Sequence, residues 1–212
     1  MMKKILLTIG LFTALCLSIL MTGCDSRQAD SLKDYTVTCK LDEKLMRDSA
    51  TLLVLEPEYH KLRVCATAHP EQGVFSFKGQ IDAPRVALIR WDNDSTRPFY
   101  FVLEAGHIQL SISPGSWSVS GSPLNMEYMK YIKQRNKIMN ARVATWQEYL
   151  KAASGSTLKR EDELRLVQQD SLLNDSLQRF TVQRINRGDA VGRIIRERFT
   201  GQLDKEHARL LK

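Results

Sequence analysis

The pattern of apolar and polar positions divides the chain into three parts. Residues 5–22 form an uncharged, mostly apolar run, residues 35–121 alternate with the two-residue period of strands, and later apolar positions recur every three or four residues. A two-residue period places alternate side chains on one face of a strand, whereas the longer spacing lines one face of a helix. We therefore expect an N-terminal apolar segment, a β-rich domain and a helical region.

The β-rich part is predicted to contain eight short strands. Alternation is clearest where Phe75 and Phe77 fall on one side and Val74 and Ser76 on the other. Turn-forming residues separate the apolar segments. The predicted strands are YTVTCKL, TLLVLEP, KLRVCATA, GVFSFKGQI, PRVALIRW, FYFVLE, HIQLSI and WSVSG. Short consecutive strands with no helix between them favour an antiparallel β-sandwich or a barrel.

The helical region is predicted to begin at Ser122, because serine suits an N-cap and Pro123 suits the first helical position. One long helix is expected to end near residue 154, and a second to cover residues 157–186. A short Gly/Ser connection implies an antiparallel hairpin. Its inner apolar stripe is predicted to contain Leu124, Tyr128, Tyr131, Ile132, Ile138, Met139, Val143, Trp146, Tyr149, Leu164, Val167, Leu173, Leu177 and Phe180.

Two shorter helices are predicted after the hairpin. Asp189 and Asp204 are suitable N-caps for helices at residues 190–200 and 205–212. The fold class is therefore α+β. We expect a β-sandwich or barrel-like domain over residues 34–121 and a helical region over residues 122–212.

The apolar run has the features of an export signal. It is 18 residues long and follows Lys3 and Lys4. The residues from Leu20 to Cys24 resemble a lipobox, although Met21 replaces the usual leucine. We predict a signal peptide over residues 1–23, lipid attachment at Cys24 and a polar tether over residues 24–33. The lipid attachment can be detected by labelling with palmitate. The alternative is an uncleaved membrane anchor, since the run is nearly long enough to span a bilayer.

A lipidated N-terminus implies attachment to a membrane through the lipid. We expect a cell-envelope location, at the outer membrane on its periplasmic or surface face, with the inner membrane as the open alternative. The formal net charge is +7, and residues 179–212 contain nine basic and four acidic residues. An exported protein meets little nucleic acid. The functional interpretation of this basic excess is therefore binding to anionic lipid, to glycan or to an acidic partner. The simpler interpretation is a solvated helix face.

Candidate chemistry is sparse. Cys39 and Cys65 form a candidate disulfide in an oxidising compartment, with two small buried side chains as the alternative. No C-x-x-C pair is present. No metal site and no cofactor are predicted, because no histidine stands at ligand spacing from a second ligand on one element. The histidines considered are His60, His69, His107 and His207.

A group of aromatic residues suggests a binding surface. Trp91, Phe99 and Tyr100 lie around one predicted loop, and such rings at the rim of a β-sandwich often bind sugars or peptides. Strand alternation requires some of these rings to face the core. We therefore keep a candidate aromatic patch and ordinary core packing as alternatives.

Several short motifs resemble a known family. They are Phe77-Lys78-Gly79, Pro84, FVLEAG from Phe101, and the run from Gly121 to Asn125. The chain resembles the domain of unknown function that precedes a thioredoxin-like domain in many Bacteroidetes lipoproteins of the thiol-disulfide oxidoreductase type. The resemblance covers roughly residues 34–150. It assigns no catalytic residue here, because the family's catalytic cysteines belong to the thioredoxin-like domain, whose linker would begin where this chain ends.

These observations predict an accessory or binding module without catalytic activity of its own. The expected partners are the membrane, reached through the lipid, and an envelope protein, peptide or glycan. One alternative is a membrane-tethered accessory of a separately encoded thioredoxin-like oxidoreductase. Another is a structural remnant of a truncated oxidoreductase.

Overall fold

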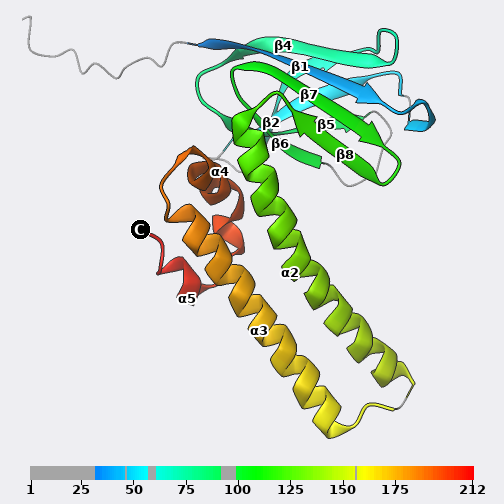
Figure 1. Ribbon diagram of the computed structural model, residues 1–212, viewed down its shortest axis with the longest axis vertical. Coiled ribbons are helices and arrows are strands. Elements are labelled where there is room, and N and C mark those ends of the chain that lie inside the picture. The colour runs from blue at the N-terminus through cyan, green and yellow to red at the C-terminus, as the bar shows by residue number, and fades with distance from the viewer. Residues whose placement is uncertain (1–31, 46, 57–60, 92–98, 156) are drawn as a thin grey trace, which may run out of the picture. The chain divides into compact units, whose positions relative to one another are not determined.

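In the computed structural model of the protein, the described strands form two four-stranded sheets, and the helices follow them in sequence (Figure 1). The structure describes residues 32–45, 47–56, 61–91, 99–155 and 157–212. The predicted signal peptide and Cys24 lie outside these residues. The strands are β1 (Lys33–Leu41), β2 (Ala50–Glu56), β3 (Lys61–Ala68), β4 (Val74–Ile81), β5 (Arg85–Trp91), β6 (Phe99–Leu103), β7 (Gly106–Ser113) and β8 (Ser116–Ser120). All eight predicted strands are confirmed.

The order of the strands decides between a sandwich and a barrel. One sheet has the order β4-β1-β7-β8 and the other the order β3-β2-β5-β6, so the domain is an open sandwich and not a closed barrel. The prediction of a purely antiparallel domain is wrong at one pair, since β1 and β7 run parallel. Parallel pairing needs a long crossover, and the five strands between β1 and β7 provide one.

The inner faces of the two sheets share one hydrophobic core. Phe75 and Phe77 of β4 are both buried in it, as the alternation predicted. From the facing sheet, Leu52, Ile89 and Phe101 pack into the same core. The two-residue period of the sequence therefore corresponds to one buried face on each sheet.

Helices cover the outer face of the sheet β3-β2-β5-β6. Val86 of β5 and Val102 of β6 point away from the sandwich core and form a second core with helical residues such as Tyr128 and Ile195. Burial on both faces explains why β2 and β5 read as continuous apolar runs. The helical region thus packs directly on the sandwich.

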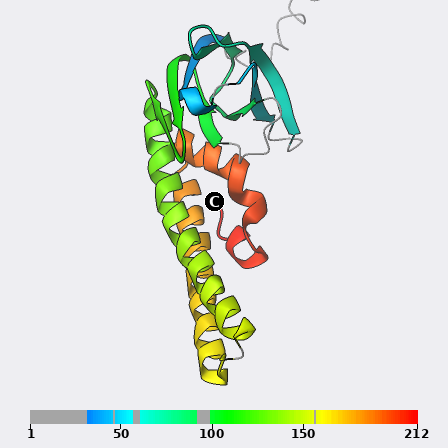
Figure 2. The same ribbon diagram turned by 90° about the vertical axis from the view of Figure 1, so that its right-hand side faces the viewer.

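The helices are α2 (Pro123–Ser154), α3 (Arg160–Ile185), α4 (Ala190–Phe199) and α5 (Lys205–Ala208), with short 3₁₀ turns at η1 (Glu43–Leu45) and η2 (Thr200–Gln202). α2 and α3 lie side by side as the predicted hairpin (Figure 2). The predicted N-caps at Ser122, Asp189 and Asp204 are confirmed. α3 begins three residues later than predicted, and α5 ends four residues earlier. Within the described residues, none of these helices combines the length and apolarity needed to cross a bilayer.

The inner stripe predicted for the hairpin is only partly correct. Tyr128, Tyr131 and Leu177 are buried, but Val143 and Trp146 are 48% and 45% exposed. Two helices can bury only the narrow seam between them, whereas near the sheet α4 adds a third packing surface. The distal half of the hairpin therefore leaves much of its apolar stripe exposed.

Candidate ligand-binding site

The open side of the sandwich is bordered by β6 in one sheet and β8 in the other. Phe99 begins β6, and its ring centroid lies 4.3 Å from that of Trp117 in β8. This contact joins the two sheets at their edges. Trp91, at the end of β5, packs edge-on against Phe75 of the core with ring centroids 5.4 Å apart. Trp91, Phe99 and Trp117 form what we call the aromatic cleft.

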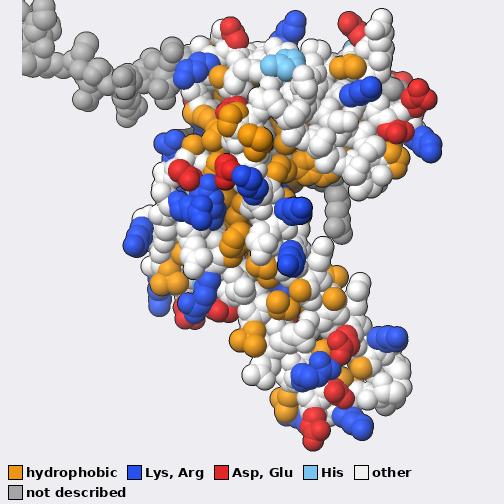
Figure 3. All heavy atoms as spheres, viewed as in Figure 1, with side chains coloured by type: hydrophobic (Ala, Val, Ile, Leu, Met, Phe, Trp, Pro, Cys, Tyr) orange, Lys and Arg blue, Asp and Glu red, His pale blue; other side chains and the backbone are white. Residues whose placement is uncertain are grey.

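A cavity of about 510 Å³ lies at the aromatic cleft. Besides the three rings, its walls include Leu41, Ile112 and the turn that joins β7 to β8. The volume falls within the range of small-ligand pockets, which are mostly apolar with few polar groups. Trp117 is 38% exposed, so a large aromatic surface remains available to a ligand. Figure 3 shows hydrophobic side chains gathered where the sheets adjoin the helices.

The three residues predicted as an aromatic patch, Trp91, Phe99 and Tyr100, all line this cavity. Trp91 and Phe99 pack against the sandwich core, whereas the ring of Tyr100 packs on the other face of its sheet, where the guanidinium carbon of Arg198 in α4 lies 3.7 Å from the ring centroid. Alternation along β6 causes this, because neighbouring residues point to opposite faces. Sequence reasoning missed Trp117. The alternation of WSVSG, which places Trp117 and Val119 on the same side, was the available signal.

The two cysteines of the described chain are free thiols. Cys39 lies in the central strand β1, and Cys65 lies in β3 of the other sheet. The candidate bridge between them is therefore not formed in this structure. Burial raises the pKa of the Cys39 thiol to about 12. Burial also raises the pKa of Cys65, although the Arg63 guanidinium opposes this effect. Neither thiol has the depressed pKa of a reactive cysteine.

The histidines make local polar contacts. His69 Nδ1 lies 2.8 Å from the Asp48 carbonyl oxygen, and His107 Nε2 lies 3.4 Å from the Thr38 hydroxyl. His60 lies outside the described residues. Across the part of the chain that the structure describes, no group of His, Cys, Asp or Glu side chains is arranged to hold a metal ion.

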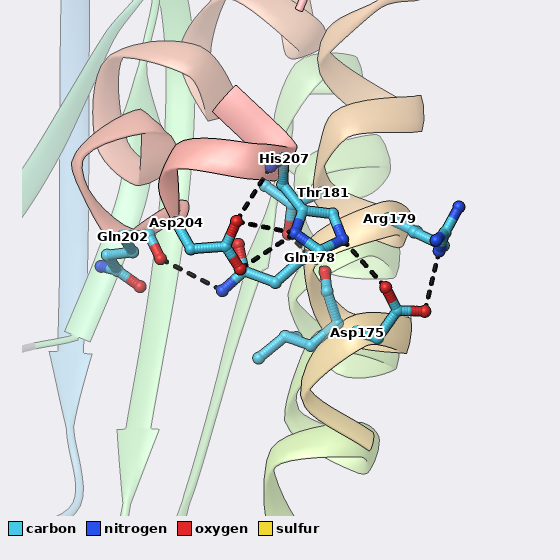
Figure 4. Close-up of polar contacts among 8 residues, drawn as sticks. Asp175, Gln178, Arg179, Thr181, Gln202, Asp204 and His207 are labelled. Carbon is cyan, nitrogen blue, oxygen red and sulfur yellow. Dashed lines mark hydrogen bonds and ion pairs between the residues drawn. The ribbon is translucent and has the colours of Figure 1, made fainter. Parts of the chain in front are cut away.

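His207 joins two elements of the helical region (Figure 4). Its Nδ1 lies 2.9 Å from both carboxylate oxygens of Asp204, and its Nε2 lies 3.0 Å from Asp175 Oδ1 of α3. Burial lowers the pKa of this imidazole, but the bonds to Asp204 and Asp175 outweigh burial and raise the pKa above its ordinary value. An imidazolium can donate to both carboxylates at once. We interpret these hydrogen bonds as structural contacts that hold α5 against α3.

A comparison with family models supports the predicted resemblance. Residues 35–128 match the family described as "Domain of unknown function (DUF4369)". The match runs from β1 into the first turns of α2, so it includes the sandwich, the aromatic cleft and the start of the helical hairpin. The comparison with curated proteins finds no match.

Proposed function

We propose that residues 35–128, which form a DUF4369 domain, are the binding part of a lipid-anchored cell-envelope protein without catalytic activity of its own. The aromatic cleft is the observation that carries the binding role. The lipobox-like segment ending at Cys24 is the basis for the anchor. The ligand would be a protein segment, a peptide or a glycan in the envelope.

The cleft favours binding because its rings lie at the margin of the sandwich core, where they are only partly buried. Trp117 presents part of its indole to solvent, while Phe99 behind it fixes its position through ring contact. Aromatic rings offer large contact areas at little entropic loss, and they stack on sugars and apolar side chains alike. This chemistry supports a binding site without requiring a reacting group.

The anchor follows from the sequence before the described residues. A basic start, an uncharged run and the Gly23-Cys24 pair form the order expected of a lipoprotein signal. Each acyl methylene buried in a bilayer stabilises attachment by about 0.8 kcal/mol, so several chains anchor a protein firmly. The cleft would then act at a membrane surface.

The non-catalytic part of the proposal is supported by the cysteine chemistry. Thiol-disulfide exchange needs an accessible thiolate, and burial raises the pKa of both Cys39 and Cys65. A second candidate function, favoured by the family resemblance, is docking of a separately encoded thioredoxin-like protein. In that case the purified protein would bind such a partner and would itself reduce no disulfide.

Tryptophan fluorescence tests the binding role. The mature protein in detergent is titrated with a panel of oligosaccharides and a panel of synthetic peptides. We expect a saturable change with at least one probe, weakened by about tenfold in Trp117→Ala. Trp146→Ala is the matched control, because Trp146 is also a half-exposed tryptophan but lies on the distal hairpin. Equal affinities for Trp117→Ala and the wild type, or no binding by any probe, would contradict the proposal.

A further inference from the structure

Within the described residues, the outer strand β8 is a sheet edge with no further strand beside it. Among the described strands it pairs only with β7, and its sequence SWSVS contains no charged residue and no proline. In the view of Figure 1 it forms the lower border of its sheet. Monomeric proteins usually protect such edges with charge, proline, a bulge or a covering segment, because the unpaired backbone groups can bind another strand.

The other three edges of the sandwich carry protection. β3 contains Lys61 and Arg63, and β4 contains Lys78. The edge of β6 is covered by α2, where the side chain of Asn125 bonds to both backbone groups of Val102. β8 therefore differs from every other edge in the described part of the sandwich.

The hairpin geometry determines which backbone groups of β8 are free. β7 and β8 are joined by the two residues Pro114 and Gly115, and Ser113 pairs with Ser116 across the turn. In a two-residue hairpin the closing pair exchanges backbone hydrogen bonds, and pairs then alternate along the ladder. The amides and carbonyls of Trp117 and Val119 consequently point away from β7, toward the free edge.

The side chains of the same two residues face the inside of the sandwich. Trp117 contacts Phe99, and Val119 packs against the sandwich core. A strand added to β8 would therefore present every second side chain toward the open side of the sandwich, where the aromatic cleft lies. The row of backbone groups and the cleft would act on one ligand together.

We propose that the ligand of the aromatic cleft is an extended peptide segment of a partner protein, which adds to β8 as a further strand and places an apolar side chain in the cleft. This inference rests on the proposed binding function. Backbone pairing supplies affinity in such complexes, and the pocket for alternate side chains supplies specificity. A glycan matches the cleft but not a row of backbone donors and acceptors that repeats every two residues.

A second copy of the chain is a weaker occupant of this edge. β8 has only five residues, so pairing between two copies of β8 would bury much less surface than the roughly 1,200 Å² of a stable dimer. A peptide needs no such area, because it can continue along the cleft and fill it.

Backbone methylation of a peptide tests the inference without altering the fold. Random decapeptides displayed on phage are selected on the full-length mature protein in nanodiscs, and the enriched peptides are synthesised. We expect apolar residues at every second position. N-methylation of single peptide amides should weaken binding by about tenfold or more at alternate residues and little at those between. Trp117→Ala should weaken the same peptides, and Trp146→Ala should not.

The other outcomes separate this inference from the proposed function. Methylation effects without a two-residue period, combined with weaker binding in Trp117→Ala, would overturn strand addition and retain the cleft as a binding site. Oligosaccharide binding through Trp117 with no enriched peptide would likewise overturn strand addition and retain the cleft as a binding site. No binding of either class would overturn both. Sedimentation that shows a dimer, dissociated by the substitution Val119→Pro at the free edge, would assign the edge to a second copy and overturn the peptide.

Discussion

The side chain of Asn125 in α2 forms hydrogen bonds with both backbone groups of Val102 at the free edge of β6. Its side-chain Oδ1 accepts a hydrogen bond from the Val102 amide at 2.7 Å, and its Nδ2 donates to the Val102 carbonyl at 2.7 Å. A neighbouring strand would make the same two bonds. The second Nδ2 hydrogen reaches the Ser122 hydroxyl oxygen, also at 2.7 Å, and that hydroxyl donates to Glu104. The first turn of α2 is thereby joined to the edge of the sandwich.

Asn125→Ala should destabilise the protein by about 3 kcal/mol, because it leaves two buried backbone groups of Val102 without partners. Denaturant midpoints measure the effect. Asn136→Ala, at an exposed position of the same helix, is the control and should change stability by less than about 0.5 kcal/mol. A similar small effect at Asn125 would mean that water or another group replaces the side chain at this edge.

Ser122→Ala and Pro123→Ala should differ sharply. The Ser122 hydroxyl oxygen accepts from the Asn125 amide at 3.1 Å and is buried, so its removal should destabilise the protein by about 2 kcal/mol. Pro123 occupies the first helical position, where an amide hydrogen would have no partner within the helix, so its replacement should have little effect. Unfolding of the two variants in urea compares them. The reverse order would show that the junction does not depend on this cap.

The contrast between Ser122 and Asn125 shows how far the sequence alone could lead. A helix cap acts within a few residues, so Ser122 and Pro123 predicted the start of α2 correctly. The bond from Asn125 to Val102 spans 23 residues and requires the position of β6 at a sheet edge. Periodicity predicts that a strand exists but gives no information on its neighbours. The parallel pairing of β1 with β7 could not be predicted for the same reason.

The aromatic cleft follows the same rule. Trp91 and Phe99 were predicted together because they flank one short connection in the sequence. Trp117 comes from the other sheet, so its contact with Phe99 depends on how the two sheets pack. His207 and Asp175 are also far apart in the sequence, and packing of α5 on α3 brings them together. Groups of residues that are close in the sequence could therefore be predicted, whereas contacts between distant segments could not.

Stability should decrease as the pH rises through the folded-state pKa of His207. The folded pKa is raised above the unfolded value of about 6.5. The stabilisation by the charged His207 imidazole is therefore fully present below the unfolded pKa and is lost above the folded pKa. Asp175 and Asp204 have lowered pKa values, caused first by bonds from Arg179 and from the His207 amide respectively. Their contribution is present above their unfolded pKa and is lost as the pH falls toward their folded values.

Urea midpoints of the wild type and His207→Gln, measured from pH 5 to pH 9, test this linkage. The difference between them should be largest below about pH 6.5 and should shrink at higher pH. Arg179 of α3 bonds to Asp175, the carboxylate that also contacts His207. His107→Gln is the control, since His107 is exposed. A difference that does not vary with pH would show that folding leaves the pKa of His207 unchanged, and a difference that shrinks at low pH would show that the folded protein holds the imidazole neutral.

The two thiols should react slowly and unequally with iodoacetamide at pH 8. Cys39 is fully buried and has a pKa of about 12, so it should be labelled only after unfolding. Cys65 is partly exposed, and its raised pKa should keep its labelling below that of a free cysteine in solution. Mass spectrometry of labelled peptides measures both rates. Rapid labelling of native Cys39 would contradict its position in the core.

Cys24→Ser should abolish lipid attachment and leave the precursor uncleaved, because the thiol must accept the diacylglyceryl group before the signal is removed. Labelling of cells with radioactive palmitate, followed by gel mobility, measures both events. Cys16→Ser is the matched control, since Cys16 lies within the apolar run and should not affect labelling. Equal labelling of Cys24→Ser and the wild type would exclude Cys24 as the attachment site. Since the aromatic cleft lies in the folded part of the chain, unlipidated protein should still bind its ligand, so anchoring and binding can be measured separately.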